Sequence, residues 1–209
     1  MKENKYDDNI FFQKYSQMSR SQQGLAGAGE WETLRKLLPD FKDKRVLDLG
    51  CGYGWHCIYA MEHGASSVVG VDISHKMLEV AKEKTHFPQV EYKCCAIEDV
   101  EFPEESFDVI LSSLAFHYVA DYEILVKKIY RILKSGGKLV FTVEHPVFTA
   151  YGTQDWHYNE KGEILHFPVD NYYYEGKRTA VFLGEKVTKF HRTLTTYLNT
   201  LFSNGFIIN

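Results

Sequence analysis

The sequence predicts an α/β protein with a doubly wound, mostly parallel β-sheet flanked by helices. From residue 44 onward, short apolar runs alternate with segments of helical hydrophobic spacing, which is the pattern of successive parallel β-α-β units. A glycine-rich turn follows the first apolar run, and an acidic residue, Asp72, ends the second. Open α/β sheets bind ligands beyond the carboxyl ends of their strands, so both features stand where a ligand site is expected.

The composition is that of an ordinary folded protein. The chain has 209 residues, of which 44% are hydrophobic and 25% charged, which suits one domain, or one domain with a cap. No apolar run approaches the ~20 residues of a membrane span, and the polar N-terminus is unlike a secretory signal. The net charge is −4 and the basic residues form no stripe. We therefore expect a cytoplasmic protein that binds neither membrane nor nucleic acid, and no particular oligomeric state is favoured.

Five strands and four intervening helices are expected in the region 44–146, with right-handed crossovers. The strands are predicted at residues 45–49, 68–72, 90–94, 107–111 and 138–143. Helical spacing is clear over 55–61, after Ser74, which is a candidate N-cap, and over 121–133. Gly136 and Gly137 are expected to end the last of these helices.

Three further regions surround this core. Residues 1–43 predict a helical segment, with one helix near Ile10–Met18, a break over 20–24 and a second helix over 25–38 before Pro39. Residues 147–190 are rich in tyrosine and in short alternating stretches, which predicts a β-rich insertion over the strand ends. Residues 191–209 predict a return helix over 193–204 and the start of a final strand pair.

The glycine-rich turn carries the strongest functional signal. Gly50, Gly52 and Gly54 occupy alternate positions between a buried strand and a helix, so a ligand can approach bare main chain at a helix N-terminus. Asp72 follows 22 residues after Gly50, a spacing at which a carboxylate can reach the hydroxyls of a ribose. The plain alternative is a tight strand-to-helix turn that binds nothing.

The spacing of these glycines bears on which nucleotide binds. A dinucleotide site requires Gly-x-Gly-x-x-Gly, whereas this turn reads Gly-x-Gly-x-Gly and follows an acidic residue, Asp48. A carboxylate there would repel a diphosphate but would suit a ligand with an ammonium and a sulfonium group. A nicotinamide-dependent oxidoreductase is therefore disfavoured.

At these residues, Asp-Leu-Gly-Cys-Gly-Tyr-Gly, the chain resembles the small-molecule, type 11 members of the class I S-adenosylmethionine-dependent methyltransferases. The resemblance runs from about Lys44 to Pro146 and implies a Rossmann-like methyltransferase fold with S-adenosylmethionine as cofactor. In this family the turn wraps the methionine part of the cofactor and the acid after the second strand binds the ribose. These roles would fall to Asp48, Gly50, Cys51, Gly52 and Asp72.

The resemblance also implies contacts with the adenine ring. The family commonly places an acid against the adenine amino group after the third strand, but Ala96 stands at the commonest position for it. We expect the Ile97 amide or the Glu98 side chain to serve instead, with Ile73 and Met77 beside the ring.

Two further contacts follow from the same resemblance. The segment that begins at Ser112 is expected to run beside the methionine end of the cofactor. The segment 1–43 would fold over the cofactor as a lid, where Tyr15 and Arg20 are candidates to close on it, Arg20 by pairing with its carboxylate. Surface charge and core packing remain the alternative for both.

His117 and His145 follow the fourth and fifth strands and are the candidate catalytic residues. Methyl transfer to a small-molecule acceptor is an in-line displacement at an activated sulfonium, so alignment carries much of the catalysis. A base is needed only if the acceptor keeps its proton, and histidine titrates in the relevant range. A structural histidine is the alternative for each. His191, Arg192 and Tyr172–Tyr174 are weaker candidates for the acceptor wall.

The cysteines and histidines predict no metal site. No Cys-x-x-Cys pair occurs, and the adjacent Cys94 and Cys95 would face opposite ways in a strand. Free thiols in a reducing cytoplasm are expected. The sequence thus predicts a small-molecule methyltransferase, with a catalytically inactive protein that binds S-adenosylmethionine or S-adenosylhomocysteine as the alternative.

Overall fold

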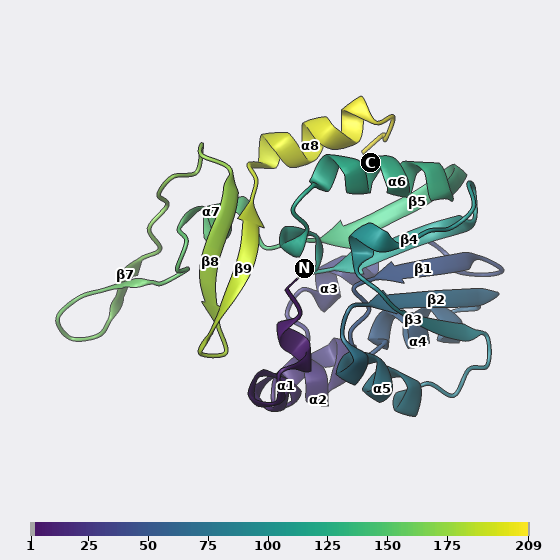
Figure 1. Cartoon of the computed structure of the whole chain (residues 1–209), viewed down its shortest axis with the longest axis horizontal. Coiled ribbons are helices and arrows are strands. Elements are labelled where there is room, and N and C mark those ends of the chain that lie inside the picture. Colours follow the sequence, from purple (N-terminus) through teal and green to yellow (C-terminus); the bar gives the residue numbers. More distant parts are fainter. Residues whose placement is uncertain (1–2, 209) are drawn as a thin grey trace.

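The structure is a computed structural model that describes residues 3–208, and its centre is a five-stranded parallel sheet (Figure 1). The strand order is β3-β2-β1-β4-β5, so the chain starts in the middle of the sheet and winds outward in both directions. The strands are β1 Arg45–Leu49, β2 Ser67–Asp72, β3 Val90–Cys94, β4 Phe107–Ser113 and β5 Leu133–Thr142. The reversal of strand order lies between β1 and β4, the position at which such sheets bind ligands.

Helices cover both faces of the sheet, as predicted. On one face α4 (Trp55–Glu62) and α5 (His75–Lys84) pack on a cluster that includes Val46, Val68 and Val109. On the other face α6 (Tyr122–Ile132) and α8 (Leu194–Ser203) pack on a cluster that includes Leu47, Leu49 and Ile110. Successive residues of β1 thus alternate between two buried faces, which explains its continuous apolar character.

The predicted strands are confirmed, but the connections differ in two places. The chain passes from β3 to β4 through a 3-10 turn, Ile97–Asp99, and extended chain, where a helix was expected. Helix α6 ends at Ile132 and β5 begins at once with Leu133, which pairs with Phe107, so the expected ending of the helix at Gly136 and Gly137 was wrong. The pairing with β4 shifts register in this part, which lets the two glycines lie within the strand.

Short helices form the N-terminal segment. They are a 3-10 turn Lys5–Asp7, α1 Asn9–Ser16, α2 Ser19–Gln22, a 3-10 turn Gly24–Gly27 and α3 Trp31–Leu37. The expected break over 20–24 and the single helix over 25–38 were therefore wrong. Gly24 has a φ of +63°, and Gly27 and Gly29 follow, so the helix cannot start before residue 31 without low-propensity residues in its first turns.

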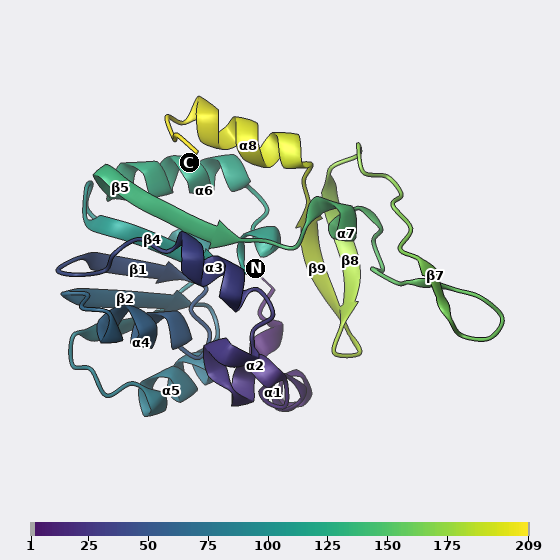
Figure 2. The same ribbon diagram turned by 180° about the vertical axis from the view of Figure 1, so that it is seen from behind.

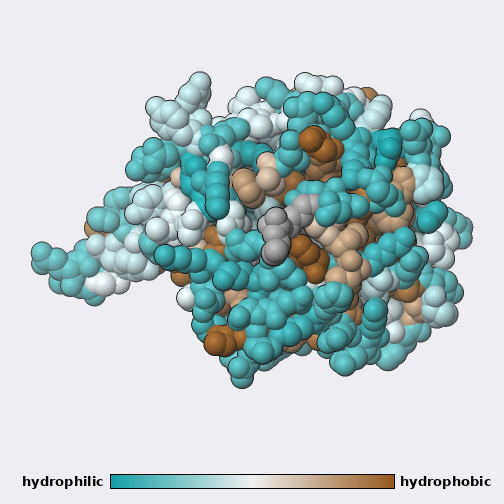
Figure 3. Space-filling view, in the orientation of Figure 1, coloured by the Kyte–Doolittle hydropathy of each residue, from teal (hydrophilic) through white to brown (hydrophobic). Residues whose placement is uncertain are grey.

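The region 147–190 contains two antiparallel hairpins preceded by α7 Pro146–Ala150. The hairpin β8–β9, Gly176–Phe182 and Glu185–His191, stands beyond the carboxyl ends of the sheet strands (Figures 1 and 2). The hairpin β6–β7, His157–Tyr158 and Ile164–His166, lies in an arm that projects from the molecule. On the face seen in Figure 3 the arm is hydrophilic to intermediate in character.

The N-terminal segment and the β8–β9 hairpin share a small hydrophobic cluster of their own. Phe11 of α1 is fully buried there, together with Ala180 and Val187. The main-chain N–H of Thr188 also donates to the carboxylate of Glu3 at 3.3 Å. Segments that are far apart in the sequence are thus joined over the carboxyl ends of the sheet (Figure 1).

The C-terminal segment packs on α6. The ring of Tyr197 in α8 meets that of Tyr122 at 4.9 Å, and the ring of Phe206 meets that of Tyr130 at 5.3 Å. The chain runs on to residue 208 as irregular structure, so the strand predicted to begin at Gly205 is wrong for the described residues. Within residues 3–208, no helix is both long and apolar enough to cross a membrane.

Replacing Gly54 with alanine is expected to destabilise the fold. Gly54 caps α4 with a φ of +74°, and a Cβ there would lie 2.1 Å from the hydroxyl of Tyr92, which Thr85 holds at 2.7 Å. The left-handed conformation costs about 1–2 kcal/mol for a non-glycine residue, and overpacking adds about 1–3 kcal/mol. Urea denaturation should therefore show a loss of about 2–5 kcal/mol in the free energy of unfolding.

The control is Gly162→Ala. Gly162 has a φ of +77°, but a Cβ there would meet no atom within 4 Å. Only the conformational cost of about 1–2 kcal/mol is expected. Equal losses in the two variants would show that the approach of Tyr92 to the turn contributes nothing.

Candidate active site

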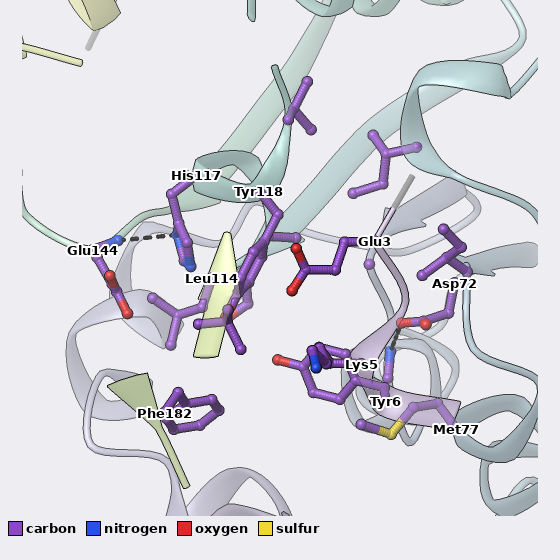
Figure 4. A pocket seen from close by; sticks show the side chains of 18 of the residues that line it. Glu3, Lys5, Tyr6, Asp72, Met77, Leu114, His117, Tyr118, Glu144 and Phe182 are labelled. Carbon is purple, nitrogen blue, oxygen red and sulfur yellow. Dashed lines mark hydrogen bonds between the residues drawn. The ribbon is translucent and has the colours of Figure 1, made fainter. Parts of the chain in front are cut away.

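A cavity of about 670 Å³ opens at the carboxyl ends of β1, β2 and β4. This volume lies in the usual range for small-molecule sites, about 300–1,000 Å³. Its walls come from the core strand ends, from the N-terminal segment and from the β8–β9 hairpin (Figure 4). Residues contributed by the last two include Glu3, Lys5, Tyr6, Tyr15, Arg20, Lys177, Phe182, Val187, Thr188 and Phe190.

The glycine-rich turn forms part of the cavity wall. The N–H groups of Gly50 and Cys51 both donate to the carbonyl of Val71, at 2.8 and 2.9 Å, and so fix the turn against β2. Gly52 has a φ of +52°, and a Cβ there would meet no atom within 4 Å, although Gly52 lines the cavity. The space above Gly52 is therefore open to a ligand at main-chain contact distance.

Asp72 lies at the end of β2 and lines the cavity, as expected, but it is buried rather than exposed. One carboxylate oxygen accepts from the N–H of Gly52 at 2.9 Å and the other from the N–H of Ser74 at 2.9 Å. Burial raises the pKa of this carboxyl group, and the two N–H groups oppose that shift. Each oxygen retains a lone pair that can accept from a ligand hydroxyl.

Asp48 lies beneath the turn and is absent from the cavity wall. Its side chain faces α4, where the thiol of Cys57 lies 3.5 Å from one carboxylate oxygen. The other oxygen, Oδ1, has no hydrogen-bond partner among residues 3–208. Burial raises the pKa of Asp48 to about 7. Cys51 lines a smaller adjoining recess of about 70 Å³, together with Gly50 and Arg20.

The residues expected around an adenine ring are brought together. All five line the cavity on the side of β2 and β3: Ile73, Met77, Ala96, Ile97 and Glu98. Ile73 and Met77 come from the end of β2 and the start of α5, and the other three from the 3-10 turn after β3 and the residue before it.

Tyr15 and Arg20 line the cavity, whereas Ser112 does not. Arg20 contacts the carboxylate of Glu30, which also accepts from the hydroxyl of Ser113 at 3.1 Å. The hydroxyl of Ser112 donates to the carbonyl of Leu49 at 2.7 Å within the sheet. Side chains of a strand alternate between its faces, so Ser113 lines the cavity in place of Ser112.

The two candidate histidines lie in different environments. His117 is buried and lines the cavity, and its Nδ1 accepts from the N–H of Glu144 at 3.4 Å (Figure 4). Burial lowers the pKa of His117 to about 4, although the Glu144 carboxylate opposes this shift. His145 is exposed, caps α7 by accepting from the N–H of Val147 at 3.2 Å, and is absent from the cavity wall. The prediction that His145 borders the acceptor is therefore wrong.

Past the end of β5, the cavity is lined by Glu144, whereas the sequence predicted its neighbour His145 there. Its carboxylate accepts from the Lys189 ammonium at 2.5 Å and from the Gln154 amide at 2.8 Å, and Lys189 also donates to Gln154 at 2.9 Å. The Lys189 side chain is only 3% exposed. These partners come from the insertion, whose packing no periodic signal in the sequence reveals.

Tyr6, Tyr118 and Phe182 add aromatic rings to the same end of the cavity (Figure 4). Burial raises the pKa of both Tyr118 and Tyr6 well above the ordinary value of a tyrosine, so both keep their hydroxyl protons. None of the three was predicted from the sequence, where the one signal for an aromatic wall is the overall content of 15% aromatic residues.

The weaker acceptor candidates lie outside the cavity wall. His191 is fully buried and bonds to Thr149 and to the carbonyl of Tyr172, each at 2.8 Å. Arg192 donates to the carbonyls of Val119 and Ala120 and so fastens the insertion to the core. Within residues 3–208, no group of three or more histidine, cysteine, aspartate and glutamate side chains is placed to hold a metal ion.

Comparison with known proteins agrees with this geometry. The model of a family described as methyltransferase domain matches residues 47–141. An uncharacterized protein of Haemophilus influenzae is 36% identical over 216 residues, which is 97% of this chain and 83% of that protein. The chain is also 36% identical to a ubiquinone biosynthesis O-methyltransferase of Coxiella burnetii over 112 residues, but these span 47% of that enzyme.

Two crystal structures match nearly the whole chain. One, assigned to the S-adenosylmethionine-dependent methyltransferases and from Listeria monocytogenes, is 57% identical with a TM-score of 0.83, covering 87% of this chain and 85% of that chain. The other, an S-adenosylmethionine-dependent methyltransferase from Mesorhizobium loti, is 41% identical with a TM-score of 0.83, covering 89% and 84%. The chain therefore belongs to the class I S-adenosylmethionine-dependent methyltransferases, and it is an enzyme with S-adenosylmethionine as its cofactor.

Proposed function

We propose that this enzyme methylates a small-molecule acceptor inside the cavity, by in-line displacement. The observation that carries the proposal is the cover over the strand ends, which is made by the N-terminal segment and the β8–β9 hairpin. A cavity of about 670 Å³ beneath such a cover suits a cofactor and a small acceptor better than a macromolecular chain. Neither nucleic acid nor membrane is proposed as a partner, and the cysteines of residues 3–208, which form no disulfide with one another, fit a cytoplasmic location.

The cofactor is assigned to the side of the cavity formed by β1, β2 and β3. The open lone pairs of Asp72 would accept from the ribose hydroxyls, and the wall of Ile73, Met77 and residues 96–98 would flank the adenine. The main chain of Gly50 and Gly52 would face the methionine part. When bound, the cofactor supplies a methyl group activated by a sulfonium.

The protein's own role in this proposal is to hold the acceptor in line with the methyl group and the sulfur of the cofactor. Arg20 would reach the cofactor carboxylate by exchanging its present partner, Glu30. Asp48, which lies below the turn, would act through the field of its carboxylate rather than by contact. His117 remains the proposed catalytic group, since it lines the cavity at the end of β4.

A labelled-methyl screen tests the proposed function. The enzyme is incubated with methyl-tritiated S-adenosylmethionine and, separately, with a small-molecule extract, total RNA and a protein extract. Label is expected in the small-molecule fraction. Label confined to RNA or protein would overturn the proposal of a small acceptor.

Replacing Asp72 with alanine should weaken the binding of S-adenosylmethionine. Loss of a hydrogen bond to a charged group costs about 1.5–3 kcal/mol, or roughly tenfold to 150-fold in the dissociation constant. Isothermal calorimetry measures the affinity. Because Asp72 also accepts from Gly52 and Ser74, the alanine variant should be less stable as well.

Two further variants separate binding from folding. Asp72→Asn keeps the size of the side chain and tests the same bond if the alanine variant does not fold. Asp108→Ala is the matched control, since Asp108 accepts from the N–H of Arg45 at 2.9 Å at the opposite end of the sheet. It should lose stability and keep its affinity. Unchanged affinity in a folded Asp72 variant would make the ribose assignment wrong.

Replacing Asp7 with alanine should weaken the closure of the N-terminal segment over the cofactor. The Asp7 carboxylate accepts from the hydroxyl of Ser74 at 2.5 Å and from the N–H of Lys76 at 3.1 Å, which ties the segment to the start of α5. Losing these bonds, at about 0.5–1.5 kcal/mol each, should speed the dissociation of S-adenosylhomocysteine by about fivefold to a hundredfold.

The neighbouring residue provides the control. Asp8 accepts from the N–H groups of Ile10 and Phe11, both in α1, at 3.0 and 2.9 Å. Asp8→Ala should therefore lower the stability of the fold through the lost N-cap of α1 and leave dissociation unchanged. Equal dissociation rates for both variants, measured by stopped-flow displacement, would mean that the segment does not act as a lid.

A further inference from the structure

The position of the proton on His117 follows from its hydrogen bond. Nδ1 accepts from the main-chain N–H of Glu144, so Nδ1 carries no proton in this arrangement. A neutral imidazole holds its one proton on the other nitrogen, Nε2. Within residues 3–208 no group bonds to Nε2, and the ring projects into the cavity beside Leu114 (Figure 4). His117 therefore presents an N–H donor, Nε2–H, to the cavity.

The surroundings of the ring keep it neutral. Three charged groups act on it: Glu144 favours the charged ring, and Lys189 and Arg192 oppose it. The ring of Tyr118 packs on it at 4.4 Å, and burial is the largest influence, so the pKa is lowered to about 4. A histidine in this state does not gain or lose a proton between pH 5.5 and 8.5, in contrast to a general base poised near neutrality.

Glu144 provides the complementary group. Its pKa is lowered: burial would raise it, but the Lys189 ammonium and the hydrogen bonds from Lys189 and Gln154 outweigh that effect. It is therefore a carboxylate, 23% exposed, on the cavity wall. Lys189 and Gln154 hold its two oxygens, and each oxygen has a lone pair left. Glu144 thus presents a hydrogen-bond acceptor to the cavity, beside the N–H donor of His117.

We propose that His117 and Glu144 form a donor–acceptor pair that recognises the methyl acceptor, with His117 donating to it from Nε2–H and Glu144 accepting from it. The pair fits an uncharged ring compound that presents an oxygen lone pair next to an O–H or N–H group. Tyr6, Tyr118 and Phe182 supply the aromatic wall for such a ring. A carboxylate at that place would be repelled by Glu144. The part of this inference that concerns the acceptor rests on the proposed function. The tautomer and charge of His117 do not depend on it.

The first test needs no acceptor. Long-range ¹H–¹⁵N NMR of protein labelled at histidine distinguishes the two neutral tautomers. His117, assigned by its loss in His117→Gln, should show the neutral Nε2–H form at every pH from 5.5 to 8.5. A Nδ1–H form, or titration within that interval, would overturn the proposal. Both results are independent of whether a methyl acceptor is found.

The second test uses a panel of hydroxylated aromatic and N-heterocyclic compounds, each paired with its carboxylate-bearing counterpart, and methyl-tritiated S-adenosylmethionine. Label should enter the uncharged members. With an accepted compound, His117→Ala should lower kcat/KM by about tenfold to a hundredfold, as expected for misplacement. His117→Gln, which keeps an N–H donor, should stay within about threefold of the parent. Glu144→Gln should relax the rejection of the carboxylate counterparts.

The outcomes of the second test are decisive in both directions. Equal losses of ~10²–10⁴ for His117→Ala and His117→Gln would identify a general base and overturn the proposal. Preferential labelling of the carboxylate counterparts by the parent would overturn it as well. His63→Ala is the control, because His63 is exposed and its ring bonds to the carbonyl of Tyr59 at the end of α4. It should match the parent.

Discussion

The site depends on one set of main-chain hydrogen bonds between the first two strands. The carbonyl of Val71 accepts from the N–H groups of both Gly50 and Cys51, and the carboxylate of Asp72 accepts from that of Gly52. These bonds join the glycine-rich turn and the acid after β2 into a single rigid unit. Because left-handed φ angles are required at Gly50 and Gly52, few other residues could make this connection.

Successive side chains of a strand point to opposite faces of the sheet, and this alternation decides which residues near the strand ends reach the cavity. Asp48 is two residues from Gly50, yet it faces α4 and bonds to Cys57. Ser113 replaces Ser112 for the same reason, and past the end of β5 Glu144 stands where His145 was expected. The predicted strand ends thus border the cavity, but at the end of β4 and past the end of β5 the residue on its wall is the neighbour of the predicted one. A shift of one residue reverses the direction of the side chain.

Much of the core could be predicted because its determinants are local. Apolar runs placed the five strands, as the sheet order shows, and the glycine turn and Asp72 line the cavity at the carboxyl ends of these strands. The acceptor end could not be predicted, because it is assembled over long separations. Lys189 meets Glu144 across 45 residues, and Thr188 meets Glu3 across 185. No sequence pattern predicts these two contacts, because each depends on how the β8–β9 hairpin packs.

The shared cluster of Phe11 with Ala180 and Val187 has a consequence for the order of assembly during synthesis. The five strands of the sheet are complete once residue 142 has been made. The cavity, however, lacks a wall until the β8–β9 hairpin has emerged and the N-terminal segment has found it. A ribosome-bound chain whose five strands have already folded therefore still lacks part of the cavity wall, and Phe11 can meet Ala180 and Val187 only after the whole sheet has been made.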